Sequence, residues 1–170
     1  MNKRLFSVFL VVLLLALAVT SSVSAQGPVV SRLATVSVGS YDVAVGDTFT
    51  VPVTITGVSN LYGADVRLVY APAVLQGARV DHGYFLQPDF VVRKGFYGTP
   101  PYFARYALTQ INPTPPASGS GVLMYVTFRA VAPGTSTLAL SGILSDRNGV
   151  RLPFVTQGGM VTVVDAEQDR

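Results

Sequence analysis

The segment from Gly46 to Leu86 reads GDTFTVPVTITGVSNLYGADVRLVYAPAVLQGARVDHGYFL. Apolar and polar residues alternate in it with a period of two, on both sides of the pair Gly57-Val58. This alternation is typical of β-strands with one buried and one solvent-facing side. The predicted inward rows are Phe49, Val51, Val53 and Ile55, followed by Ala64, Val66, Leu68 and Tyr70. The segment therefore predicts two half-buried strands of an all-β domain.

Pro52 lies within the first of these strands. Proline has no backbone N–H to donate to a ladder, so within sheets it is found on edge strands and at bulges. The first strand is therefore expected to run along a sheet edge at this residue.

The same alternation recurs along the rest of the chain. A third strand is expected to place Val122, Met124, Val126, Phe128 and Ala130 inside and Leu123, Tyr125, Thr127 and Arg129 outside. Shorter strands are predicted at 35–38, 78–81, 90–93, 103–109, 137–141, 150–155 and 160–164, and loops at 95–102 and 111–121. About nine short strands separated by Gly- and Pro-containing turns predict a two-sheet antiparallel β-sandwich.

The N-terminal 25 residues have the pattern of a secretory signal peptide. Asn2-Lys3-Arg4 forms a basic start, an apolar run covers 5–19, and Val23-Ser24-Ala25 is a small-residue cleavage site. The apolar run is shorter than the roughly 20 residues that a spanning helix needs. We therefore expect a secreted, extracellular protein that makes no stable membrane insertion after cleavage. Residues 26–34 are expected to be a lead into a domain at 35–164, and 165–170 a disordered tail.

The composition narrows the class of partner and the source of stability. Loss of Lys3 and Arg4 with the signal lowers the formal net charge from +3 to +1, which argues against a nucleic-acid partner. The chain has no cysteine. An exported domain without disulfides must be held together by its apolar core.

The sequence contains no recognisable catalytic or metal-binding motif. The single histidine, His82, follows Asp81, and neighbours in a strand point to opposite faces, so the two are not placed as a base and its orienting group. The run Asp146-Arg147-Asn148-Gly149 is interpreted as a hairpin turn rather than a calcium loop. The prediction is a protein that is not an enzyme and that holds neither a metal nor a cofactor.

Four short motifs carry a resemblance to a known family. They are Gly46-Asp47-Thr48, Gly57-Val58, Tyr70-Ala71-Pro72-Ala73-Val74-Leu75 and Gly83-Tyr84-Phe85-Leu86. In this order and spacing they resemble a cohesin module over about residues 35–164, with Ala71 at the place where the family usually carries Asp. The resemblance implies a jelly-roll sandwich that acts by non-covalent recognition in extracellular polysaccharide-degrading assemblies. Its implied partner is a helical dockerin-type module that carries the calcium itself. A single module predicts an adaptor rather than a multi-module scaffold.

The resemblance also implies where a partner binds. It places Asp65 on the family's recognition Asp and Gly63 on its recognition Asn, so only the aspartate role carries over. Alternation puts Arg67 and Val69 on the same outward side as Asp65. Further partner-binding candidates are Phe103, Arg105 and Thr109, and Leu123 and Tyr125 are expected to extend the same flat face. The alternative interpretation of Asp65 and Arg67 is an ordinary solvated pair on an exposed strand.

Two alternatives from other classes remain open at this point. A carbohydrate-binding module on the same sandwich would stack aromatic rings on sugar, with Tyr97 and Tyr102 as candidate residues among the loop aromatics. The chain has no tryptophan, the side chain best suited to such stacking. A purely structural or adhesive surface domain is the other alternative.

Overall fold

The computed structural model describes residues 33–87 and 89–165. The predicted signal peptide, nearly all of the lead at 26–34 and residues 166–170 of the tail lie outside the described residues. Twelve strands make up the described part: β1 (Ala34–Val38), β2 (Tyr41–Ala44), β3 (Thr48–Leu61), β4 (Gly63–Val69), β5 (Leu75–His82), β6 (Phe90–Tyr97), β7 (Phe103–Gln110), β8 (Ala117–Ala130), β9 (Gly134–Ser145), β10 (Arg151–Leu152), β11 (Phe154–Gln157) and β12 (Gly159–Val164).

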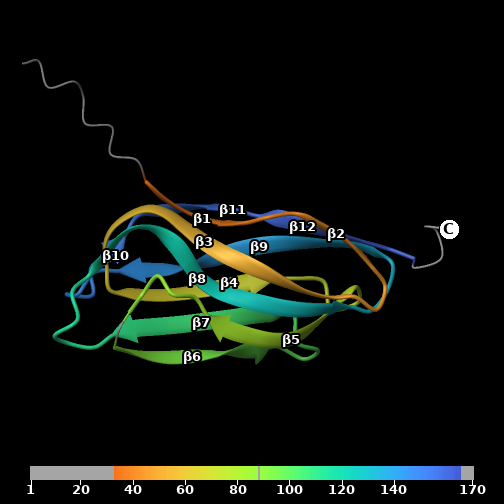
Figure 1. Ribbon diagram of the computed structural model, residues 1–170, viewed down its shortest axis with the longest axis horizontal. Coiled ribbons are helices and arrows are strands. Elements are labelled where there is room, and N and C mark those ends of the chain that lie inside the picture. Colours follow the sequence, from red (N-terminus) through yellow and green to blue (C-terminus); the bar gives the residue numbers. More distant parts are fainter. Residues whose placement is uncertain (1–32, 88, 166–170) are drawn as a thin grey trace, which may run out of the picture. The chain divides into compact units, whose positions relative to one another are not determined.

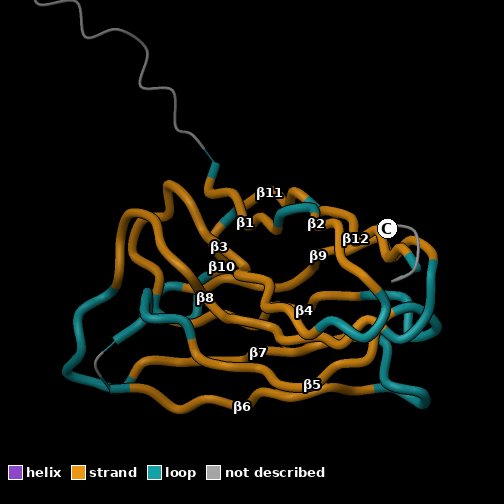
Figure 2. The backbone as a smooth tube through the Cα atoms, turned by 45° about the vertical axis from the view of Figure 1, so that its right-hand side comes forward, coloured by secondary structure: helices purple, strands orange, loops and turns teal. Residues whose placement is uncertain are grey.

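The strands form two packed sheets (Figure 1). The order in the first sheet is β11-β1-β3-β8-β5, and in the second it is β2-β12-β9-β4-β7-β6, with β10 paired to β9. Where the tube in Figure 2 is coloured by secondary structure, it contains strands and loops only. The described residues form no helix with the length and apolar character that crossing a membrane requires. The prediction of an all-β sandwich is confirmed, with twelve strands in place of about nine.

The two ends of the domain meet in both sheets. β1 pairs in parallel with β11, and β2 pairs in parallel with β12, whereas the other pairings are antiparallel. The short β2 was not predicted from the sequence, because the four residues YDVA give too few alternations to recognise. This strand is defined by its pairing with β12, which lies far away in the sequence.

The core lies between the sheets and uses the predicted inward rows. The most deeply buried side chains include Leu68, Val51, Val53, Val126 and Phe128, each 0% exposed. Phe49 is only half-buried, and its ring centroid lies 6.0 Å from those of Tyr41 and Phe128. Phe49 therefore lies at the rim of the core rather than inside it.

The prediction that Leu123 points outward is wrong, because β8 contains a bulge. Val53 pairs with Met124 and Thr54 with Val122, so Leu123 has no opposite residue. The extra residue shifts the alternation, and Leu123 becomes buried while Val122 is half-buried. Two predicted loops are also partly strand, since β6 continues to Tyr97 and β8 begins at Ala117.

The edge predicted at Pro52 exists only locally. β3 is an interior strand with β1 on one side and β8 on the other. The pairing with β1 covers Val53 to Thr56 and stops before Pro52, which pairs only with Tyr125 of β8. Pro52 therefore lies where the strand has one neighbour, and its missing N–H leaves no ladder bond unmade.

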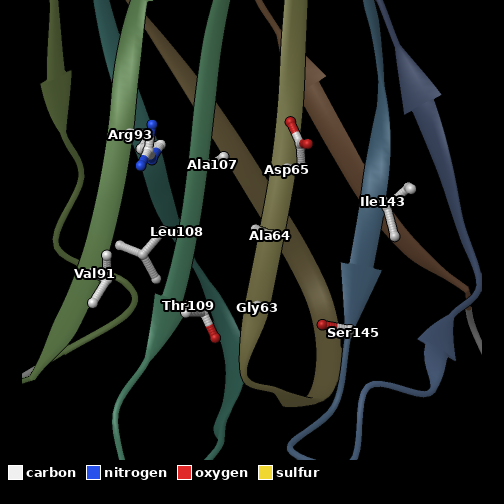
Figure 3. A pocket seen from close by; sticks show the side chains of 10 residues that line it. All are labelled: Gly63, Ala64, Asp65, Val91, Arg93, Ala107, Leu108, Thr109, Ile143 and Ser145. Atoms are coloured by element: carbon white, nitrogen blue, oxygen red, sulfur yellow. The ribbon is translucent and has the colours of Figure 1, made fainter.

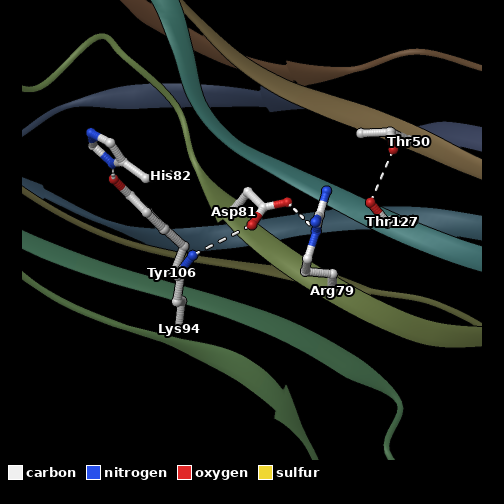
Figure 4. Close-up of polar contacts among 7 residues, drawn as sticks. All are labelled: Thr50, Arg79, Asp81, His82, Lys94, Tyr106 and Thr127. Atoms are coloured by element: carbon white, nitrogen blue, oxygen red, sulfur yellow. Dashed lines mark hydrogen bonds and ion pairs between the residues drawn. The ribbon is translucent and has the colours of Figure 1, made fainter.

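The open edges of the two sheets meet where β5 lies near β6 (Figure 4). Asp81 Oδ1 lies 3.6 Å from Lys94 Nζ, and Asp81 Oδ2 lies 2.6 Å from Arg79 Nε. His82 points to the other side of β5, where its Nδ1 lies 2.6 Å from the hydroxyl of Tyr106. An outward hydroxyl pair, Thr50 with Thr127 at 2.9 Å, joins β3 to β8 on the first sheet.

The buried row predicts the effect of a charge in the core. Leu68→Asp places a carboxylate without a partner at a fully buried position, which costs several kcal/mol, a large part of the about 5–15 kcal/mol that stabilises a domain. We expect the variant to be unfolded or to melt far below the wild type in circular dichroism. Val69→Asp, the same change on the solvent side of the same strand, is the control and should melt close to the wild type. A cooperative, wild-type melt of Leu68→Asp would contradict the assigned core.

His82 predicts a pH dependence of stability. Burial lowers the pKa of His82 from 6.5, the charge of Lys94 lowers it further, and the backbone of Leu86 acts in the opposite direction. Below pH 6.5 the unfolded chain takes up a proton at His82 that the folded chain does not. The free energy of unfolding therefore falls as the pH is lowered, until the pH passes the folded-state pKa. Urea titrations between about pH 8 and 5.5 should show this slope, with His82→Gln flatter than the wild type. Equal slopes for the wild type and His82→Gln would contradict a lowered pKa of His82 in the folded protein.

Candidate protein-binding face

The outward side of β9, β4, β7 and β6 forms a regular grid of side chains. Residues that pair across antiparallel strands point to the same face of a sheet. The pairings give four rows: Val91, Thr109, Gly63 and Ser145; Arg93, Ala107, Asp65 and Ile143; Gly95, Arg105, Arg67 and Ser141; and Tyr97, Phe103, Val69 and Ala139. We call this surface the β4–β7 face.

An ion pair lies at the centre of the β4–β7 face. Arg105 Nε donates to Asp65 Oδ1 at 2.9 Å, and Arg105 Nη2 donates to Asp65 Oδ2 at 2.6 Å. The two residues are diagonal neighbours on adjacent strands, and both side chains are about one third exposed. Hydrogen bonding and the negative charge of Asp65 raise the pKa of Arg105. The carboxylate is thus fixed in direction while remaining open to solvent on one side.

An aromatic group lies at one end of the face. The rings of Tyr97 and Phe103 stack with centroids 5.6 Å apart, and Tyr102 meets Phe103 edge-on at 5.1 Å. The guanidinium carbon of Arg67 lies 5.7 Å from the Phe103 ring centroid, within the range of a cation–π contact. Tyr97 and Tyr102 are 40% and 47% exposed. The two residues considered for carbohydrate binding therefore adjoin the residues considered for protein binding.

A trough of about 340 Å³ lies at the other end (Figure 3). Its floor is made by short side chains on the two central strands, Gly63 on β4 and Ala107 and Thr109 on β7. A Cβ on Gly63 would approach Ser145 Oγ to 2.7 Å, so glycine keeps this floor low. Val91 on β6 and Ile143 on β9 form the two rims and are 56% and 41% exposed.

The structure brings the six sequence-predicted partner-binding residues together. Asp65, Arg67 and Val69 of β4 and Phe103, Arg105 and Thr109 of β7 all lie on the β4–β7 face. The expected contribution of Leu123 and Tyr125 is wrong, because β8 belongs to the other sheet and Leu123 is buried. Whether the six residues contact a partner remains a prediction.

Sequence reasoning missed half of this face. Val91 and Arg93 of β6 and Ile143 of β9 were within or close to predicted strands, and their outward side could have been read from the alternation. Local patterns in the sequence do not indicate that β6 and β9 flank β7 and β4. The register that places Arg105 against Asp65 was also not available from local patterns.

Asp81 and His82 do not combine into a catalytic pair. They diverge from β5, Asp81 to Arg79 and Lys94 and His82 to Tyr106. Within residues 33–87 and 89–165, no cluster of three or more His, Cys, Asp or Glu is arranged to hold a metal ion. The turn at 146–149 is a hairpin, as predicted, in which Asp146 Oδ1 accepts from the backbone N–H groups of Asn148 and Val150 at 2.8 Å.

Comparison with known proteins identifies the family. The Cohesin domain model matches residues 34–158, and the chain therefore belongs to the cohesin domain family. A search of curated protein sequences finds no match.

Solved structures of cohesins have the same fold. A non-cellulosomal cohesin from the hyperthermophilic archaeon Archaeoglobus fulgidus is similar with a TM-score of 0.68 and 24% identity, covering 81% of this chain and 95% of that one. The third cohesin ScaC of Acetivibrio cellulolyticus, solved in complex with the ScaB dockerin, has a TM-score of 0.66 and 18% identity. This match covers 78% of this chain and 99% of that one. The cohesin CaCohA2 from Clostridium acetobutylicum has a TM-score of 0.62 and 25% identity, and the match covers 79% of this chain and 92% of that one.

Proposed function

We propose that this cohesin domain is a non-catalytic module that binds a dockerin-type protein through its β4–β7 face. The observation that carries the proposal is the convergence of all six predicted contact residues on one continuous sheet face. Several structurally similar cohesins were solved in complex with dockerins. Calcium belongs to the partner in this proposal. The signal-like pattern of the first 25 residues supports a place of action outside the cell.

The Asp65–Arg105 pair gives the face its specificity in this proposal. The carboxylate and guanidinium are held in one geometry before a partner arrives, so little side-chain entropy is lost on binding. Arg105 occupies one direction around each carboxylate oxygen, and the remaining lone pairs can accept from hydroxyl or backbone donors on a docking helix. Asp65 therefore acts as an oriented acceptor.

Removal of this acceptor is the direct test of the proposal. Loss of a central interface group costs about 2 kcal/mol of binding free energy, so Asp65→Ala should weaken capture of a dockerin module about 30-fold in isothermal titration. The melting temperature should change little, because an ion pair that is about one third exposed contributes at most about 1 kcal/mol. Asp42→Ala, which removes an exposed carboxylate from the outer strand β2, is the control and should bind as the wild type does.

A double-mutant cycle tells whether the pair acts as one unit. If Arg105 serves to orient Asp65, adding Arg105→Ala to Asp65→Ala should cost no more affinity than the worse single change. Equal affinity of the wild type and Asp65→Ala for a dockerin module that binds would place the partner on another surface. Failure of every dockerin in a broad panel to bind the wild type would overturn the proposed function.

A carbohydrate-binding role is the second candidate, and the exposed rings of Tyr97 and Tyr102 are the observation in its favour. Both rings already contact Phe103, Tyr97 at an interplanar angle of 23° and Tyr102 at 62°, so the two tyrosines do not form a single flat platform for a sugar. We expect no strong retention of the wild type on cellulose, xylan or chitin in affinity electrophoresis and pull-down. Tight retention that Tyr97→Ala and Tyr102→Ala abolish, with an unchanged melt, would favour the carbohydrate role instead.

A further inference from the structure

We propose that the β4–β7 face selects an acidic amphipathic helix, with an apolar side chain in the trough and carboxylates on Arg67 and Arg93. This inference rests on the proposed function and adds the chemistry of the partner. It follows from three observations on the face: its uncompensated positive charge, its aliphatic rims and the spacing between those rims.

The charge of the face is one-sided. Its charged residues are Asp65, Arg67, Arg93 and Arg105, a formal sum of +2 on a domain whose remaining surface is nearly balanced. Asp65 compensates Arg105. Among the described residues, no acidic side chain forms an ion pair with Arg67 or with Arg93. The neighbouring Lys94 points to the sheet edge, where it lies near Asp81. Two arginines are therefore available to carboxylates of a partner.

The trough is shaped for an aliphatic side chain. Its rims, Val91 and Ile143, are branched aliphatic residues, and its floor is glycine, alanine and threonine. Such walls suit the packing of leucine, isoleucine or methionine, whereas sugar rings are recognised by flat aromatic surfaces. Arg93 and Asp65 line the same trough, so an apolar group in it has a cation close by (Figure 3).

The spacing of the rims fits a helix. Val91 on β6 and Ile143 on β9 are separated by three strand intervals of about 4.8 Å each, or about 14 Å. An α-helix with its side chains is about 10–12 Å wide, so one helix lying along β4 and β7 covers both central strands and reaches the rims on β6 and β9. An added β-strand would require a sheet edge rather than this face.

The same charge argues against other occupants. A second copy of the chain, docked by a two-fold axis through this face, would bring like charges together. An anionic polysaccharide would satisfy the arginines but leave the aliphatic trough unfilled. An acidic helix satisfies both features at once.

Three helix-stabilised peptides of equal length test the inference. All carry leucines at positions i and i+4, flanked by glutamate in one, glutamine in the second and lysine in the third. Binding to the purified protein is measured by fluorescence anisotropy, and the face contacted is mapped by NMR chemical-shift changes. We expect the glutamate peptide to bind about tenfold more tightly than the lysine peptide, with the difference shrinking as NaCl rises from about 0.05 M to 0.5 M.

Matched variants locate the effect. The double variant Arg67→Glu with Arg93→Glu should abolish or reverse the preference for glutamate. Arg129→Glu, an exposed arginine on the outer side of the other sheet, is the control and should keep the preference. Ala107→Tyr fills the floor of the trough and should weaken binding of all three peptides.

The outcomes separate this inference from the proposed function. Equal binding of the three peptides, a preference that survives in the double variant, or one lost equally in Arg129→Glu would overturn the inference. Stronger binding of polygalacturonate, or self-association through this face, would overturn it as well. Dockerins that bind without charge preference would leave the proposed function standing, whereas acidic peptides binding where no dockerin does would leave only the inference.

Discussion

Burial of one side of β4 is the constraint on which the rest of the structure depends. Ala64, Val66 and Leu68 are nearly inaccessible and hold this strand against the opposite sheet. A slip of one residue in its pairing with β7 or β9 would expose these side chains to water and would place Asp65 and Arg67 in the core. The apolar core thus fixes the polar pattern of the outer face without contacting it.

The Asp65–Arg105 pair depends on this register in both strands. The carboxylate comes from β4 and the guanidinium from β7, and their diagonal placement follows from the pairing of Arg67 with Arg105. Conversely, the pair adds little to stability, because both groups are partly solvated. Its significance lies in geometry, since a fixed carboxylate presents the same acceptor to every partner that approaches.

Local alternation was enough to predict β3, β4 and the inward rows, because a period of two has one physical meaning in a half-buried strand. It failed at Leu123, where a bulge adds a residue to β8 that the alternation of the sequence does not indicate. It also could not give the order of strands, which is set by packing between segments far apart in the chain. For this reason Tyr125 was grouped with Phe103, and Val91, Arg93 and Ile143 were not recognised as part of the same face.

The parallel pairings at the two ends of the domain have a consequence for folding. β1 and β2, the first strands, pair in parallel with β11 and β12, the last strands of the described domain, and β1 pairs on its other side with β3. Contacts between such distant segments carry a large loop-closure entropy and make folding slow compared with that of locally paired domains. The first sheet needs β11, which ends at Gln157, and the second needs β12, which ends at Val164, so neither sheet can be completed before these late segments have been synthesised.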